Sequence, residues 1–133
     1  MAITTKGVLD WILYEKAGSD HCRLIEFIKQ LIEGKKKKII LIDNASCHRN
    51  ENVKEFIAKS KNDFVYILPY HHLQNPIEKF FNQLKYYMKK DELMSYDLIK
   101  KSIRKSIKYI ELKTYRNYFK SSLTKTKRKY KRN

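Results

Sequence analysis

Two apolar segments, each followed by a polar stretch that contains a carboxylate, constrain the fold of this chain most strongly. Residues 39–42 are four consecutive aliphatic residues, and Asp43 follows them directly. A short apolar run of this kind predicts a buried β-strand, with Asp43 at its C-terminal edge. A second strand is expected over residues 64–68, which are aromatic and aliphatic in the same way. The order of these segments indicates an α/β chain whose polar residues collect beyond the strand ends.

The second carboxylate, Glu78, is expected in the first turn of a helix. Asn75 is a favourable N-cap, Pro76 is favoured at the first helical position, and apolar residues then recur at helical spacing over residues 77–90. Two acidic residues that lie at one edge of a sheet can bind a divalent cation. Two structural roles remain open as alternatives to metal binding. Asp43 could cap its own turn, and Asn75 with Glu78 has the form of a capping box.

The rest of the chain predicts a hairpin and several helices around these strands. We expect a hairpin over residues 2–14, helices over residues 20–33, 50–60 and 96–110, and a further helix over 112–123. This order favours a sheet of mixed direction flanked by helices. The two cysteines are interpreted as free thiols.

The charge of the chain indicates a polyanionic partner. The net charge is +16, with 30 lysine and arginine residues. A surface this basic attracts nucleic acid through counterion release. We interpret the basic run 35–38 as a solvated loop in preference to a DNA contact. The C-terminal block is expected to be disordered alone and to contact the DNA backbone, or to serve as a targeting run, through Lys125, Lys127, Arg128, Lys129, Lys131 and Arg132.

No apolar run is long enough to span a bilayer, and no signal peptide is visible. We therefore expect no membrane partner and an intracellular location, in the cytoplasm or nucleoid, or in the nucleus of a eukaryotic host.

Two sequence blocks resemble motifs of one family. Residues 41–48 read LIDNASCH and resemble the "DNAxxH" motif of DDE transposases of the mariner-like superfamily, which includes bacterial insertion-sequence relatives. Residues 68–78 read LPYHHLQNPIE and resemble that family's "LPPYSPDLNPIE" block. Lys85 stands where the family has the lysine of its "W..LK" continuation. The 34 residues between Asp43 and Glu78 match the interval between the family's second and third acids.

The resemblance implies a ribonuclease H-like, retroviral-integrase-like fold and a transposase that cleaves and transfers DNA strands at transposon ends. Asp43 and Glu78 would be the second and third acids of an Asp-Asp-Glu set that holds two Mg²⁺ or Mn²⁺ ions. The residues that would support these acids or contact the substrate are Asn44, His48, Asn75 and Lys85; buried capping roles for Asn44 and His48 stay open.

The chain also departs from the family pattern. Residues 71–73 read HHL where the family has Ser-Pro-Asp, and the first catalytic aspartate belongs on a strand before the hairpin. Asp10, on the hairpin, fits a solvent-facing position better than that role. We therefore expect an N-terminally truncated domain.

The expected parts are a partial DDE catalytic domain without its first strand (1–92), a helical extension (93–123) and a basic tail (124–133). Alone, the chain is expected to show little or no strand transfer. A homodimer or an upstream-encoded transposase portion would be its partner. The alternative is a non-enzymatic, basic DNA-binding protein derived from a transposase.

Overall fold

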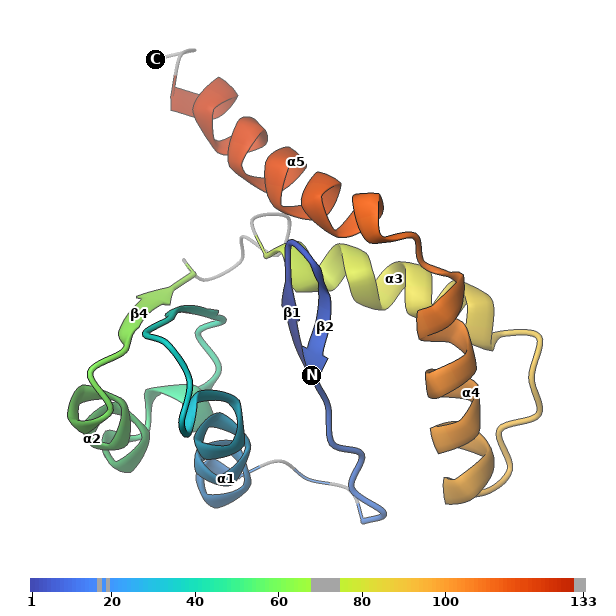
Figure 1. Cartoon of the computed structure of the whole chain (residues 1–133), viewed down its shortest axis with the longest axis horizontal. Coiled ribbons are helices and arrows are strands. Elements are labelled where there is room, and N and C mark those ends of the chain that lie inside the picture. Colours follow the sequence, from blue (N-terminus) through green and yellow to red (C-terminus); the bar gives the residue numbers. More distant parts are fainter. Residues whose placement is uncertain (17, 19, 68–74, 131–133) are drawn as a thin grey trace. The chain divides into compact units, whose positions relative to one another are not determined.

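The computed structural model describes residues 1–16, 18, 20–67 and 75–130, with side chains as far as Ser122. The chain divides into two compact units, which are described separately. The sheet unit consists of residues 16–72, and the helical unit consists of residues 1–15 together with residues 73–133. Figure 1 labels most of the helices and strands of both units.

The sheet unit contains a parallel pair of strands and the helices that pack on it. Strand β3 (Ile39–Ile42) pairs in register with β4 (Asp63–Tyr66), so that Ile42 lies opposite Tyr66. The strand expected over residues 39–42 is confirmed, whereas the second strand begins one residue earlier and ends two residues earlier than expected. The other elements are α1 (His21–Ile32), one turn of 3₁₀ helix, η1 (Ser46–Arg49), and α2 (Glu51–Lys59).

The core of the sheet unit lies on one face of β3 and β4. Ile28, Val53 and Ile57 are buried there, and Ile40 and Phe64 pack against them. The other face is open within this unit, with Ile39 74%, Leu41 41% and Val65 48% exposed. The expectation of a buried strand is therefore wrong for β3, because α1 and α2 supply apolar side chains to one face of the pair and not to the other.

The helical unit begins with a hairpin and continues with three helices. The hairpin strands are β1 (Ala2–Thr4) and β2 (Gly7–Asp10), which pair antiparallel. The strand expected as far as residue 14 ends at Asp10. The helices are α3 (Pro76–Met88), α4 (Tyr96–Tyr109) and α5 (Leu112–Tyr130).

Helix α5 extends beyond its expected end at residue 123. Its backbone is helical as far as Tyr130. Residues 131–133 lie outside the described part of the chain. The extension is consistent with composition, because lysine and arginine are good helix formers and no glycine or proline follows Leu112.

One apolar cluster joins the helices of the helical unit. Phe80 is fully buried, and its ring centroid lies 5.9 Å from that of Tyr115. The residues from α3, α5 and the α4–α5 junction that form this core are Phe80, Leu84, Ile110, Tyr115 and Tyr118. The C-terminal helices therefore share a core with α3 and do not form one of their own.

Tyr118 makes the stability of this core sensitive to alkaline pH. Its hydroxyl donates a hydrogen bond to Gln83 Oε1. Burial, with smaller effects from Tyr115 and Tyr87, raises the pKa of Tyr118 to about 12 from an ordinary value of 10.0. The folded protein therefore holds this proton at pH values where the unfolded chain has lost it. Stability contributed by the neutral phenol is complete below pH 10 and is lost as the pH rises towards 12.

We expect the Tm of the wild type to fall more steeply between pH 10 and about 12 than the Tm of Tyr118→Phe. Thermal denaturation followed by circular dichroism would measure both slopes. Other tyrosines and lysines titrate in this range in both proteins. The difference between the two slopes of Tm against pH therefore reports the contribution of Tyr118. Equal slopes would show that Tyr118 does not titrate differently in the folded state.

Candidate functional site

Asp43 lies at the carboxyl end of the parallel strand pair. It follows Ile42, whose carbonyl oxygen accepts a hydrogen bond of 2.9 Å from the N–H of Ile67 just beyond β4. The carboxyl ends of parallel strands are the usual location of ligand and catalytic groups in α/β proteins. The side chain of Asp43 is 49% exposed, so its carboxylate is accessible from solvent.

His48 is paired with Asp43. Its Nδ1 atom lies 2.6 Å from Asp43 Oδ1 and 3.3 Å from the main-chain oxygen of the same residue. Both neighbours are acceptors, so Nδ1 carries a proton and donates it. In a neutral imidazole, Nε2 is then the unprotonated nitrogen.

Tyr66 and the turn η1 hold His48 in place. The N–H of His48 donates to Ala45 O at 3.0 Å. The hydroxyl of Tyr66, the last residue of β4, donates to His48 O at 2.7 Å. The turn after β3 therefore places His48, five residues after Asp43, next to the Asp43 carboxylate. Tyr66 was not identified from the sequence, where its only signal is a polar hydroxyl within the apolar strand expected over residues 64–68.

These bonds restrain one oxygen of the Asp43 carboxylate. Oδ1 accepts from His48 and also from the N–H of Ala45 at 3.1 Å. Asp43 therefore does cap its own turn, as one alternative proposed, but it is also paired with His48. Among the described residues, Oδ2 has no hydrogen-bond partner, and an exposed carboxylate oxygen is a ligand that Mg²⁺ or Mn²⁺ accepts. Asn44, the next residue, is partly buried.

In the helical unit, Glu78 lies in the first turn of α3. Asn75 is buried and caps the helix by accepting a hydrogen bond of 3.3 Å from the N–H of Ile77. Among the described atoms, the Asn75 side chain does not accept from the Glu78 N–H and the Glu78 carboxylate does not bond to the Asn75 N–H, so Asn75 caps the helix without a capping box. A carboxylate in this turn is stabilised by the positive end of the helix dipole.

Lys85 shares a face of α3 with Glu78. Seven residues correspond to nearly two helical turns, which separate the two positions by about 10 Å along the axis. Lys85 is exposed, while Phe80 and Leu84 on another face are buried in the core. Lys85 is therefore available to a ligand that reaches the first turn of this helix.

The candidate residues fall into two groups, one in each unit. Asp43, Asn44 and His48 belong to the sheet unit, and Asn75, Glu78 and Lys85 belong to the helical unit. Residues 68–74, which contain most of the second motif, lie outside the described residues. Within the described ranges, no group of three or more histidine, cysteine, aspartate or glutamate side chains is arranged to hold a metal ion.

The C-terminal basic residues are described only in part. Lys125, Lys127, Arg128 and Lys129 lie on the helical backbone of α5, and their side chains are not described; Lys131 and Arg132 lie outside the described residues. Over the part of the chain that the structure describes, no helix is both long enough and apolar enough to cross a membrane.

Comparison with known proteins identifies the family. Residues 1–100 match the model of the DDE superfamily endonuclease family. The match spans 100 of 133 residues and includes both Asp43 and Glu78. This chain therefore belongs to the DDE superfamily of endonucleases. The matched region ends within α4, so α5 lies outside the match. No match was found among curated proteins.

Proposed function

We propose that this chain is part of a transposase of the mariner-like or insertion-sequence group, with a ribonuclease H-like fold, that cleaves and transfers DNA strands. The observation that carries the proposal is the Asp43–His48 pair at the carboxyl end of β3. It lies within the "DNAxxH"-like block, and the family match covers it. Membership of the endonuclease superfamily and the net charge of +16 support DNA as the substrate.

In this proposal, Asp43 and Glu78 provide carboxylate oxygens to Mg²⁺ or Mn²⁺. Bound divalent ions in such sites activate the attacking oxygen and neutralise charge on the phosphodiester. The chain's own residues set the position of the ligands. His48 and the Ala45 N–H hold one oxygen of Asp43, and the other has no hydrogen-bond partner among the described residues. Asn44, Asn75 and Lys85 support the acids or contact the substrate.

Mn²⁺ binding tests this proposal without requiring turnover. Isothermal titration of the wild type is expected to show binding that Asp43→Asn and Glu78→Gln each weaken by about tenfold or more, because each variant removes a charged oxygen ligand. Two matched controls are expected to bind normally. Asp63→Asn removes an exposed acid of the same strand pair, and Asp97→Asn removes an acid from the first turn of α4. Unchanged affinity in Asp43→Asn would contradict the proposal.

A second candidate function is DNA binding without catalysis, and the charge of +16 is the observation that favours it. The same variants separate the two. A non-enzymatic DNA-binding protein would bind DNA strongly and would show no Mn²⁺ binding that depends on Asp43 or Glu78.

A further inference from the structure

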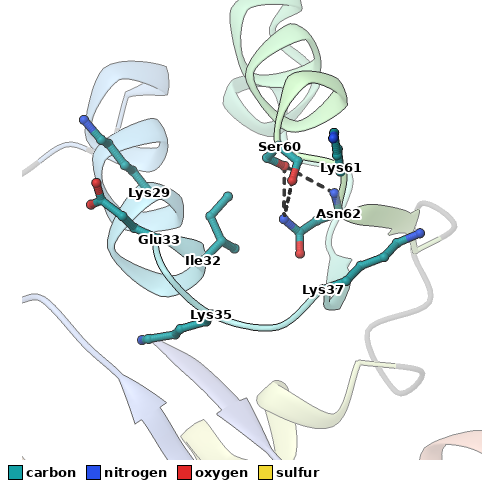
Figure 2. A pocket seen from close by; sticks show the side chains of 8 residues that line it. All are labelled: Lys29, Ile32, Glu33, Lys35, Lys37, Ser60, Lys61 and Asn62. Atoms are coloured by element: carbon teal, nitrogen blue, oxygen red, sulfur yellow. Dashed lines mark hydrogen bonds between the residues drawn. The ribbon is translucent and has the colours of Figure 1, made fainter.

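A pocket in the sheet unit has side chains that do not converge on a ligand. It has a volume of about 510 Å³, and Figure 2 shows that the lysine side chains around it point in different directions. Lys35 Nζ donates to Gln30 O at 3.4 Å. Lys37 Nζ lies 3.1 Å from Asp63 Oδ2. Polar side chains do converge in the helical unit, where α5 packs on the first turns of α3.

One lysine of α3 donates hydrogen bonds to two serines of α5. Lys79 Nζ donates to Ser121 Oγ and, at 3.1 Å, to Ser122 Oγ. Both hydroxyls donate in turn to the main-chain oxygen of Tyr118, at 3.3 Å and 2.9 Å respectively. Each hydroxyl therefore uses its hydrogen within α5 and offers a lone pair to the ammonium group of Lys79.

A second hydrogen bond joins the same two helices one turn further along α3. Gln83 lies four residues after Lys79, which places both side chains on one side of the helix. Gln83 Oε1 accepts from the hydroxyl of Tyr118. Tyr118 is 7% exposed and Ser122 is 1% exposed, so these bonds lie where α5 packs closely on α3. Together they fix the rotation of α3 about its own axis against α5.

Stability alone is a poor explanation for a lysine at position 79. The positive end of the helix dipole opposes a cation this close to the N-terminus of α3. Lys79 is also partly buried, and burial of a charged group costs hydration that its partners must replace. Well-packed apolar side chains often join elements as strongly as buried charged groups do. The preceding residue is Glu78, so the bonds that hold Lys79 also hold the turn that carries the candidate metal ligand.

We propose that Ser121 and Ser122 are positioning residues for Glu78. Through Lys79 they fix the rotation of the first turn of α3, and that rotation sets the direction of the Glu78 carboxylate. Because site residues must be held within about 0.5 Å of their productive positions, a small rotation is enough to weaken metal binding. The proposal rests on the proposed function, since it takes Glu78 as a metal ligand. It gives α5 a role in the site although α5 lies outside the matched residues 1–100.

Mn²⁺ titration of the full chain tests this role. Ser121→Ala/Ser122→Ala removes two acceptors of Lys79 and is expected to weaken Mn²⁺ binding by about threefold to tenfold. Alanine is the best helix former, so α5 is expected to stay helical. The control is Ser102→Ala, which removes a buried serine hydroxyl of α4 that bonds to Asp91. Its Mn²⁺ affinity is expected to stay within about twofold of the wild type, because the lost bond does not involve the first turn of α3.

A double-mutant cycle separates positioning from general destabilisation. If the serines act through Glu78, replacing them in the Glu78→Gln background is expected to cause no further loss of Mn²⁺ affinity. Equal losses in the wild-type and Glu78→Gln backgrounds would overturn the proposal. Ser121→Thr/Ser122→Ala restores one hydroxyl at the partly buried position and is expected to bind Mn²⁺ more tightly than the double alanine variant.

Hydrogen exchange of main-chain amides reports on α3 without metal. In Ser121→Ala/Ser122→Ala, the amides of the first turns of α3 are expected to exchange faster, while those near Leu84 keep wild-type rates. Unchanged exchange throughout α3 would overturn the proposal. Wild-type Mn²⁺ affinity in this variant, with Mn²⁺ binding that still depends on Glu78, would overturn the positioning role alone. Mn²⁺ binding that does not depend on Glu78 would overturn the proposed function and this role with it.

Discussion

Raising the salt concentration from about 50 mM to about 200 mM is expected to weaken duplex DNA binding by this chain by about a thousandfold, the change for roughly six phosphate contacts. The reason is the net charge of +16, which makes the release of counterions from DNA the main source of affinity. Anisotropy titrations over a series of salt concentrations would give the slope. A slope near zero would contradict DNA binding through phosphates, in either of the candidate functions.

A truncated chain is the control for the contribution of the basic tail. Removing residues 124–133 deletes Lys125, Lys127, Arg128, Lys129, Lys131 and Arg132, and is expected to reduce the slope by up to about five. The truncation must not extend back to Leu112, because Tyr115 and Tyr118 of α5 are buried in the core. A slope unchanged by the truncation would show that the tail does not contact DNA.

Replacing Phe80 with alanine is expected to destabilise the helical unit by about 3–5 kcal/mol. Phe80 is fully buried on α3, and its ring packs beside Tyr115 of α5 and Phe81. The loss combines the apolar area that is no longer buried with the cavity that remains in the core. It is a large part of the about 5–15 kcal/mol by which domains are usually stable. Urea denaturation followed by circular dichroism would measure the free energy of unfolding.

Phe81→Ala provides a matched control for this effect. Phe81 is the same residue type at the next position of α3, but it is only partly buried at the edge of the cluster. Its replacement is expected to cost less, because less area leaves the core and water can fill the space. If the two variants were equally destabilised, the core would not be centred on Phe80.

The features that the sequence predicted well depend on local chemistry. Helices were expected to begin at about residues 20 and 50 and after the Asn75 cap, and the side chains of Asp20, Asn50 and Asn75 each accept a main-chain hydrogen bond there. Strand β3 matches its predicted range because it consists of four consecutive aliphatic residues, which favour a strand. The position of Asp43 at the end of that strand follows from the same run. The α/β class is confirmed for the same reason, since short apolar runs and amphipathic stretches alternate along the chain.

The features that the sequence could not predict depend on contacts between distant residues. The bond from Tyr66 to His48 spans 18 positions and forms only when β4 pairs with β3. The exposure of Ile39 depends on which face α1 and α2 cover, and an aliphatic run carries no information about that. The hydrogen bond from the N–H of Lys38 to Asn62 joins two loops that are 24 positions apart.

The central proposal is that Asp43 and Glu78 both provide carboxylate ligands to bound divalent metal. Fe²⁺ replaces Mg²⁺ at sites built from carboxylates, and with ascorbate and peroxide it cleaves the backbone nearest to it. Mass spectrometry of the fragments is expected to show cuts close to Asp43 and close to Glu78, and both cuts should disappear in Asp43→Asn and in Glu78→Gln. Cleavage near only one of the two acids, or cuts near Glu78 that persist in Asp43→Asn, would contradict the claim.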